Sequence, residues 1–423
     1  MKTRLYNARI LTLADDQKIF NGEIVINDDK IEYVGPERED SLEYDINKDC
    51  KGNLLMPGFK NAHTHSGMSV LRSLADDLPL SDWLNNAIFP VEAKMRAEDI
   101  YYFTQLSVLE YLTSGITACF DMYLTPESIA NAMDDCGFRC VQVGGANDFS
   151  QSSELLEKWY NTLNQKDSLQ SFMLGFHAEY TNSIENLKSY AALAQKYKAP
   201  VYTHLGETKA EVEGCIERYK MPPLKFLDSL GMFDYGGGIY HGVYVTDEEM
   251  DIMKEKNIFV VTNPASNAKL ASGIAPVKKY LDKGISVAIG TDGPASNNCL
   301  DMFREMFLVT GLGKIVNEDA SSIDAFEVLK MACVNGAHAM NLNDCDTLKA
   351  GKKADIIMID LNMPNMQPIN NIAKNIVYSG SKINVKMTMI NGKVLYENNE
   401  FKLDIDPDKL YAKVDSIKKR IIG

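Results

Sequence analysis

The sequence predicts an α/β protein: a (β/α)8 barrel of the TIM type with a small β-sandwich side domain built from both chain ends. In the middle of the chain, short apolar runs alternate eight times with helical stretches. The two ends show only short alternating strands. Several histidines and an aspartate end or follow the apolar runs of the middle part, at the strand ends where such barrels carry their active sites.

The amino-terminal residues 1–56 have an all-β pattern. The runs TRLYNARILTL and GEIVINDDKIEYVG are strand-like, with Asn-Asp and Gly-Pro turns. After Asn341 the β pattern resumes in ADIIMIDL, NIVYSG and VKMTMINGKVLYENNEF, and the chain ends in a short polar helix. Because each end alone has too few strands to bury a face, we expect residues 1–56 and 347–423 to pair into one side domain.

Residues 57–346 carry the barrel pattern of strands and helices. The expected strands are Leu54–His65, Gly115–Met122, Arg139–Gly145, Ser171–Glu179, Pro200–Glu207, Gly238–Val245, Asn257–Asn263 and Ser286–Gly293. The helical stretches between them include Ala97–Thr113, Ile184–Tyr197 and Asp247–Glu255. Eight strands that alternate with helices predict a closed parallel barrel.

Composition restricts the classes of partner. The 423 residues are 45% hydrophobic and 24% charged, with a formal net charge of -14. An acidic chain lacks the basic surface that binds nucleic acid or anionic membranes, so we expect a small-molecule partner. The eight cysteines form no CxxC pair, the amino terminus has no signal-peptide stretch, and no apolar run approaches the ~18 residues that span a bilayer. We therefore expect a cytoplasmic protein with reduced thiols.

Five side chains are predicted to meet at one end of the barrel. His63 and His65 are two residues apart at the end of an apolar run, so a strand would point both imidazoles to the same face. His204, His241 and Asp292 each end or follow a later run. The carboxyl ends of parallel strands share one rim, and this convergence predicts a mononuclear metal site. His338, in the helical context NGAHAM, has no such partner and is interpreted as an ordinary core or surface histidine.

Six motifs carry a resemblance to a known family. They are PGFKNAHTH, LRSLADDLPLSDWL at 71–84, GFHAEYTNS at 175–183, THLGET at 203–208, NPASNAKL at 263–270 and GTDGPASNN at 290–298. With them the chain resembles the amidohydrolase superfamily, and within it the deaminases of S-adenosylhomocysteine, 5'-methylthioadenosine and 5'-deoxyadenosine. The resemblance implies one divalent metal per subunit, usually zinc, held by His63, His65, His204 and Asp292. The same ligand set accepts Fe²⁺ or Mn²⁺.

The residue types also indicate the chemistry. Three neutral imidazoles and one carboxylate leave a position for water, whose pKa a divalent cation lowers towards neutrality. Glu207, three residues after His204, is the expected proton shuttle, although a surface carboxylate at a strand end is the plainer interpretation. His241 is expected to hydrogen-bond the attacking oxygen, and Asp292 to serve as a proton acceptor besides binding metal.

The resemblance further implies a nucleoside substrate. His177 lies where members with two metals carry a modified lysine, and it is implied to reach a ribose hydroxyl. Glu92 in FPVEAKM is implied to bind the 2'- and 3'-hydroxyls, and Trp83 to pack on the purine. Taken singly, Glu92 reads equally well as a solvated helix residue and Trp83 as a core residue.

The sequence departs from the family at one point. Members that accept S-adenosylhomocysteine use arginines after the third strand, but CVQVGGANDFSQSSEL has none between Arg139 and the next helix. An unpaired carboxylate is costly to bury, which favours 5'-deoxyadenosine, 5'-methylthioadenosine or adenosine.

Other functions remain open. One alternative is a free-base deaminase acting on guanine, 8-oxopurine or cytosine. A second is a triazine chlorohydrolase on the same scaffold. A non-enzymatic metal-bound protein is disfavoured because Glu207 and His241 accompany the ligands. Relatives in the superfamily are often dimers or tetramers, so we expect a homo-oligomer.

Overall fold

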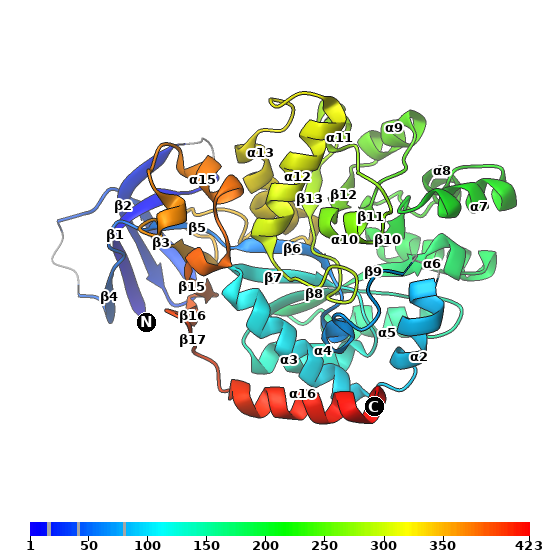
Figure 1. The fold of residues 1–423 in the computed structure, drawn as a ribbon, viewed down its shortest axis with the longest axis horizontal. Coiled ribbons are helices and arrows are strands. Elements are labelled where there is room, and N and C mark those ends of the chain that lie inside the picture. The colour runs from blue at the N-terminus through cyan, green and yellow to red at the C-terminus, as the bar shows by residue number, and fades with distance from the viewer. Residues whose placement is uncertain (15–17, 40–42, 79–81) are drawn as a thin grey trace.

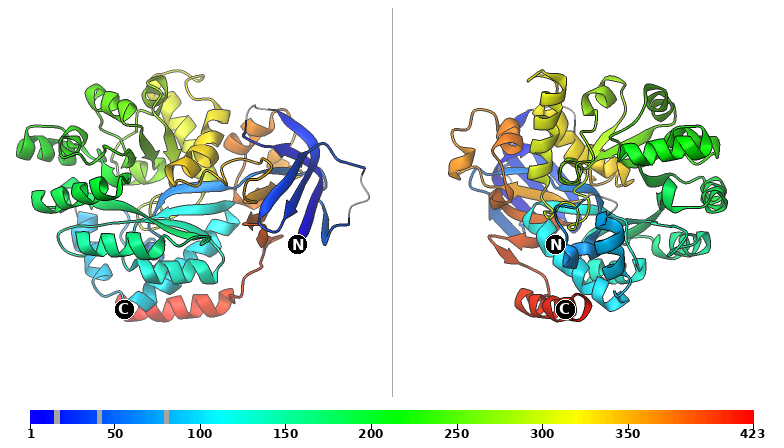
Figure 2. Two further views of the ribbon diagram at one scale, coloured as in Figure 1. Left: turned by 180° about the vertical axis from the view of Figure 1, so that it is seen from behind. Right: turned by 45° about the vertical axis from the view of Figure 1, so that its right-hand side comes forward.

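The structure is a computed structural model that describes residues 1–14, 18–39, 43–78 and 82–423. Its strands form two sheets, one of eight strands and one of nine. The eight-stranded sheet curves into a nearly closed barrel inside a ring of helices (Figure 2). The predicted α/β barrel with an additional β domain is therefore confirmed.

All eight predicted barrel strands are present and pair in parallel, in chain order. They are β6 (Phe59–Thr64), β7 (Ile116–Asp121), β8 (Arg139–Val143), β9 (Gln170–Ala178), β10 (Val201–Leu205), β11 (Gly237–His241), β12 (Ile258–Thr262) and β13 (Val287–Ile289). The loop after the last strand meets the first strand, where the Asp292 N–H donates to the His63 carbonyl at 2.9 Å. The side chain of Asn61 also accepts the Thr291 N–H at 2.8 Å.

The helices follow the strands along the chain and cover the outside of the barrel (Figure 1). They are α3 (Ala97–Thr113), α4 (Pro126–Asp135), α5 (Ser153–Leu163), α6 (Ile184–Tyr197), α7 (Lys209–Tyr219), α8 (Pro223–Ser229), α9 (Asp247–Glu255), α10 (Pro264–Lys269), α11 (Val277–Asp282), α12 (Met302–Asn317), α13 (Ala325–Lys330) and α14 (Gly336–Ala339). The bounds of α3, α6 and α9 agree with those expected from sequence. Side-chain caps explain two of these starts: the hydroxyl of Ser183 accepts from the Asn186 N–H, and Thr246 forms a capping box with Glu249.

Both chain ends contribute to the nine-stranded sheet. Its strands are β1 (Lys2–Leu11), β2 (Ile19–Asn27), β3 (Lys30–Gly35), β4 (Ile46–Asp49), β5 (Leu54–Pro57), β14 (Ile356–Ile359), β15 (Val385–Ile390), β16 (Lys393–Glu397) and β17 (Glu400–Phe401). The order is β17-β16-β15-β14-β5-β1-β2-β3, with β4 beside β1. The antiparallel pair β5–β14 joins the amino-terminal strands to the strands that follow the barrel, and these two groups lie side by side in Figure 1 (blue and orange).

Two strand predictions need correction. The expected strand Leu54–His65 is divided at Gly58, because β5 pairs in the nine-stranded sheet and β6 in the barrel. A Cβ at Gly58 would lie 2.1 Å from Thr117 Cγ2, so only glycine fits this crossing. The segment NIVYSG is not a strand but part of helix α15 (Ile372–Tyr378). The side chain of Asn371 caps that helix, and Ile372 and Ile376 recur at the helical spacing on its buried side.

The last helix, α16 (Pro407–Ile421), returns to the barrel. It lies along α3, where Ile417 and Ile421 belong to the same buried cluster as Phe103. Arg420 pairs with Asp99 at the start of α3. We propose the domain boundaries near residues 56 and 347, where the chain passes between the two sheets. Helix α16 follows the β domain in sequence but packs against α3 of the barrel, so it connects the two domains. None of the helices that the structure describes is long and apolar enough to traverse a lipid bilayer.

Candidate active site

The five residues predicted to converge lie together at the carboxyl ends of the barrel strands. His63 and His204 are the penultimate residues of β6 and β10, and His241 is the last residue of β11. His65 follows β6 by one residue, and Asp292 lies three residues beyond the end of β13. The expected eighth strand, Ser286–Gly293, is thus shorter than predicted, and Asp292 lies in a loop.

His241 and Asp292 both have left-handed backbone conformations, with φ of 70° and 60°. This conformation is uncommon for residues other than glycine. Such backbone strain persists where the surrounding structure holds it, often at functional sites. At Asp292 the N–H is fixed by the His63 carbonyl of the neighbouring strand.

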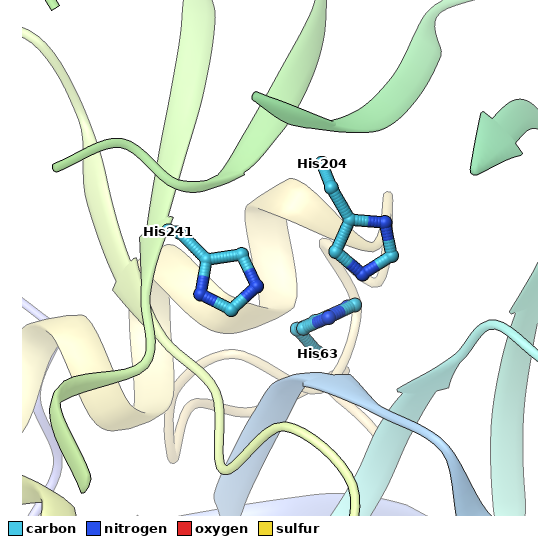
Figure 3. Close-up of side chains that lie close together, drawn as sticks. All are labelled: His63, His204 and His241. Atoms are coloured by element: carbon cyan, nitrogen blue, oxygen red, sulfur yellow. The ribbon is translucent and has the colours of Figure 1, made fainter. Parts of the chain in front are cut away.

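Two overlapping groups of potential ligand atoms share His63. The ring nitrogens of His63, His204 and His241 lie within 4.8 Å of one another, and the three rings point toward a common centre (Figure 3). The second group is His63, His65 and Asp292. In it, Asp292 Oδ1 is 3.0 Å from His65 Nε2 and 3.5 Å from His63 Nε2.

Hydrogen bonds behind the site orient these side chains. His204 Nδ1 lies 2.6 Å from the His177 carbonyl oxygen, and His65 Nδ1 contacts the Met122 carbonyl. Each bond fixes the far nitrogen of the ring and leaves Nε2 for the centre of the site.

The carboxylate of Asp292 and the ring of His241 are also held by hydrogen bonds. The hydroxyls of Ser266 and Ser296 donate to Asp292 Oδ2 at 2.6 and 2.7 Å, so Oδ1 is the oxygen that faces the histidines. His241 Nδ1 lies 2.8 Å from Asn267 Oδ1. The supporting bonds direct one donor atom from each residue at a common point.

Burial keeps the imidazoles of His63 and His204 neutral, which is the form that binds metal, whereas the Asp292 carboxylate raises the pKa of His65 despite its burial. Burial lowers the pKa of His63 to about 3 and the pKa of His204 well below the usual value. Burial alone would raise the pKa of Asp292, but the contacts of its carboxylate with His63 and His65 outweigh burial and hold that pKa well below its usual value. His63 and His204 are therefore neutral imidazoles and Asp292 an ionised carboxylate, which are the forms that bind a metal.

One unsatisfied residue supports metal binding at this point. His63 is fully buried, and neither of its ring nitrogens has a hydrogen-bond partner among the described residues. Its ring stacks on Tyr240 with centroids 3.7 Å apart, so the ring cannot turn towards another acceptor. Buried polar atoms are rarely left unpaired in native proteins. A cation bound by His63, His65, His204 and Asp292 would satisfy His63 Nε2.

Glu207 lies beside this centre. Its side chain is nearly buried, with Oε2 3.8 Å from His241 Nε2 and Oε1 accepting from the Ser272 hydroxyl at 3.4 Å. Glu211 fixes the loop by accepting the Glu207 N–H at 2.9 Å. Burial raises the pKa of Glu207, so its carboxyl binds a proton more readily than an exposed glutamate does.

A pocket of about 610 Å³ opens from this centre and is lined by Trp83, Glu92 and His177. This volume suits a small-molecule ligand. Trp83 begins the short helix Trp83–Ile88 and is buried, and Glu92 ends α2 (Phe89–Glu92). The structure thus brings all three predicted substrate residues to one cavity beside the five converging residues. Residues 79–81 of the motif at 71–84 lie outside the described residues.

Glu92 is not a solvated helix residue. Tyr123, just beyond the end of β7, donates its hydroxyl proton to Glu92 Oε1 at 2.6 Å. Burial raises the pKa of Glu92, although this hydrogen bond acts in the opposite direction. His177 Nδ1 lies 3.1 Å from the Thr181 hydroxyl, which fixes the orientation of its ring.

The pocket is acidic and apolar. Its described lining residues include Glu92, Glu207 and Asp292 but no lysine or arginine. Arg139 begins β8 at the opposite end of the barrel, where it pairs with Asp355 at 2.8 Å. Phe149, which is 89% exposed, lines the outer part of the pocket on a loop held by Asn147.

The residues that support the site were not predicted from the sequence. Ser266 and Asn267 lie in NPASNAKL and Ser296 in GTDGPASNN, so two of the quoted motifs contained them. Tyr123 follows a barrel strand, and this position is itself a signal.

His338 is an ordinary hydrogen-bonded histidine, as interpreted from the sequence. Its Nε2 lies 2.9 Å from Asp346 Oδ2, so it is a hydrogen-bonded surface residue. The two residues are separated by the end of α14 and a turn, which a helical pattern alone does not reveal.

Known proteins resemble this chain over nearly its whole length. The model of the amidohydrolase family matches residues 54–395. A 5-methylthioadenosine/S-adenosylhomocysteine deaminase from Caldanaerobacter subterraneus subsp. tengcongensis is 40% identical over 430 aligned residues, covering 100% of this chain and 99% of the relative. A zinc-bound adenosine deaminase from Xanthomonas campestris superposes with a TM-score of 0.92 at 30% identity, covering 99% and 98% of the two chains. An atrazine chlorohydrolase from Arthrobacter aurescens, at 21% identity, covers 98% of this chain and 100% of its own, with a TM-score of 0.91; it shares the fold.

Proposed function

Because the chain belongs to the amidohydrolase family, we propose that it is a metal-dependent hydrolytic deaminase of adenosine-type nucleosides. It converts the 6-amino group of the purine to a carbonyl and releases ammonia. The main support is that a catalytic carboxyl, Glu207, and a hydroxyl-binding carboxyl, Glu92, line one pocket beside the cluster of histidines.

The metal ligands in this proposal are His63, His65, His204 and Asp292. The ion is zinc, because neutral imidazoles and a carboxylate in a compact buried site suit it best. When bound, it supplies Lewis acidity that lowers the pKa of water. The deaminase named from Xanthomonas campestris carries zinc, which agrees with this assignment.

The proton steps belong to Glu207. Its carboxylate takes one proton from the attacking water and delivers it to the purine ring nitrogen. The second proton of that water is taken up by the Asp292 carboxylate and goes to the departing amine as the new carbonyl forms. The raised pKa brings the two protonation states of Glu207 closer in free energy, which suits a group that must both accept and donate. His241 hydrogen-bonds the oxygen that attacks, since Asn267 holds its other nitrogen. Asp292 can accept a proton through Oδ1, which faces the histidines and also accepts the Gly293 N–H, whereas two serine hydroxyls occupy Oδ2.

Ribose recognition belongs to Glu92 and His177. A carboxylate can accept hydrogen bonds from two hydroxyl groups at once, which matches the vicinal 2'- and 3'-hydroxyls of a nucleoside. Tyr123 aligns Glu92 for this contact. Trp83, buried at the pocket wall, offers an aromatic surface for the purine.

The 5' substituent is small or apolar and carries no carboxylate. The pocket's described lining has carboxylates but no cationic side chain, so the amino-acid tail of S-adenosylhomocysteine would lose hydration without gaining a partner for its carboxylate. Phe149 gives an apolar contact at the outer part of the pocket. We therefore expect 5'-deoxyadenosine, 5'-methylthioadenosine and adenosine to be better substrates.

The test is kcat/KM for 5'-deoxyadenosine, 5'-methylthioadenosine, adenosine and S-adenosylhomocysteine, with ammonia release as the readout. We expect the first three to exceed the last by at least about tenfold. Activity on guanine, cytosine or a chlorotriazine without activity on nucleosides would replace this function by one of those alternatives.

The ligand assignment has its own test. His204→Ala should lower the bound metal, measured by elemental analysis of the purified protein, because three ligands hold the ion more weakly. The matched control is His338→Ala, which removes a surface imidazole and should leave metal content unchanged. Full metal in His204→Ala would remove His204 from the ligand set.

A further inference from the structure

Helix α12 carries an apolar stripe on its outward side. Phe307 is 51% exposed and Ile315 is 71% exposed, and Leu308 and Leu312 are half-buried beside them. The helix lies on the outside of the barrel in Figure 1, facing the viewer. Leu308 lies three residues from Gly311, and Phe307 and Ile315 each lie four residues from it, so all three share one side of the helix with this glycine.

Gly311 lies at the middle of this stripe. It is the tenth residue of the 16-residue helix, and in a helix interior glycine is less favourable than alanine. A Cβ added there would meet nothing within 4 Å, so packing within the described chain does not require a glycine. A glycine on an exposed helix surface lets a second backbone approach closely.

Unpaired charges of opposite sign flank the stripe. Arg304 lies in the first turn of α12 and Glu318 directly follows its last residue. Both are exposed, and neither has an ion-pair partner among residues 1–14, 18–39, 43–78 and 82–423. Each lies seven residues from Gly311, on opposite sides of it. Phe307 and Ile315 are each four residues from Gly311.

We propose that α12 is the centre of a symmetric dimer interface between two copies of this chain. Two α12 helices cross antiparallel, with the two-fold axis at Gly311. This arrangement places Phe307 of one copy against Ile315 of the other, and Arg304 against Glu318, each contact occurring twice. A two-fold interface must be complementary to itself, and the spacing of apolar and charged residues about Gly311 meets that condition.

The surface next to the stripe extends the contact. Leu308 and Leu312 line a shallow groove with Ile274, which is 38% exposed. Tyr378 of α15 is also 38% exposed and contacts Lys314. A stable dimer commonly buries roughly 800 Å² on each copy, so the helix pair needs these flanking residues. The interface lies on the outer wall of the barrel, so both pockets would remain accessible.

The first test uses sedimentation equilibrium of the metal-loaded protein over a concentration series. The wild-type chain should dimerise, and Ile315→Asp should raise the dissociation constant by about 100-fold or more, because it removes two central apolar contacts. The matched control is Ile216→Asp, which changes an exposed isoleucine on α7 and should leave the dimer intact. Turnover per subunit should be unchanged in both variants. A wild-type chain that stays monomeric at tens of micromolar overturns the proposal.

Charge reversal tests the register of the two helices. Arg304→Glu and Glu318→Arg should each weaken the dimer by about tenfold, because like charges then face each other twice. The double variant Arg304→Glu/Glu318→Arg should restore it. An oligomer that neither the single reversals nor Ile315→Asp affects would use another face, and the proposal would be wrong.

A cysteine placed at the axis gives an independent result. In Gly311→Cys, the two new thiols would face each other across the two-fold axis and form an intersubunit disulfide under mild oxidation. The wild-type chain is the control, since seven of its eight cysteines are buried and Cys299 is partly buried. Rapid formation of a covalent dimer in Gly311→Cys alone supports the axis. If Gly311→Cys still dimerises but does not cross-link, the helices do not cross at this residue.

Discussion

The two ends of the barrel differ in how their buried polar groups are paired. At the amino ends of the strands, Arg139 donates to both oxygens of Asp355 at 2.8 and 3.0 Å, and Lys60 donates to the Gly58 carbonyl and the Thr117 hydroxyl. At the carboxyl ends, both nitrogens of His63 lack hydrogen-bond partners among the described residues, and carboxyls face a pocket. Polar groups that satisfy one another stabilise the fold. Those left directed at a cavity bind a ligand.

The largest expected effect is at the carboxyl end. Glu207→Gln should keep the metal and the stability but lower kcat by about 10²–10⁴-fold, because an amide cannot cycle a proton. Metal analysis and steady-state kinetics check both parts. Glu213→Gln, an exposed glutamate of α7, is the control and should behave as the wild type. Near-normal turnover in a metal-loaded Glu207→Gln protein would take Glu207 out of the mechanism.

The next effect is at the amino end and concerns stability alone. Arg139→Met leaves Asp355 buried without its partner, and the free energy of unfolding should fall by about 3–5 kcal/mol in urea denaturation. The double variant Arg139→Met/Asp355→Leu should recover most of this loss, since two apolar side chains replace the pair. A fall in kcat of the folded Arg139→Met protein would break the proposed separation of the two ends.

The same pair predicts a pH dependence. Burial disfavours the Asp355 carboxylate, but the charge of Arg139 outweighs burial and lowers its pKa below 3.8. In the wild type this contribution to stability is therefore present above pH 3.8 and is lost as the pH falls below it. In Arg139→Met the largest influence that opposes burial is gone, although Lys60 and the Asn391 N–H still lower the pKa of Asp355. This pKa is then higher than in the wild type, so the variant loses stability relative to the wild type as the pH rises. Urea midpoints of Arg139→Met and wild type should differ less at pH 4.5 than at pH 7.5.

A smaller effect should separate substrate binding from metal chemistry within the carboxyl end. Glu92→Ala removes hydrogen bonds to a charged group worth roughly 1.5–3 kcal/mol, which lowers kcat/KM for adenosine by about ten- to over a hundredfold. The 2',3'-dideoxy analogue should lose little, because it has no hydroxyls for Glu92 to bind. Equal losses on both substrates would assign Glu92 to the metal site or to folding.

The smallest effect concerns Tyr123. Tyr123→Phe keeps the ring but removes the hydroxyl that donates to Glu92. This bond positions the carboxylate and does not itself bind substrate, so only part of the roughly 1.5–3 kcal/mol of a hydrogen bond to a charged group is lost from substrate binding. We expect kcat/KM for adenosine to fall by roughly two- to tenfold. Glu92→Ala/Tyr123→Phe should be no worse than Glu92→Ala, because Tyr123 acts through Glu92. Additive losses would show that Tyr123 has a separate role.

Much of the fold followed from local patterns. The eight barrel strands and the bounds of α3, α6 and α9 depend on apolar periodicity and capping residues within about fifteen positions, and a sequence displays these directly. NIVYSG misled because a short apolar run fits a strand or a helix, and the distant surfaces of α12 and α13 decided between them. The division of Leu54–His65 at Gly58 depended on pairing with β14, some 300 residues later.

The sequence by itself determined which chemical groups this protein has and that they end or follow barrel strands. His63 and His65 share a strand end by their spacing, and the absence of an arginine after Arg139 is visible in the letters. The tertiary structure decided how these groups meet. It placed Tyr123 on Glu92, turned Asp292 into the site through a left-handed backbone, and sent Arg139 to the opposite end of the barrel. The physical reason is that hydrogen bonds and burial depend on distances between strands and loops far apart in sequence, and only the closed barrel sets those distances.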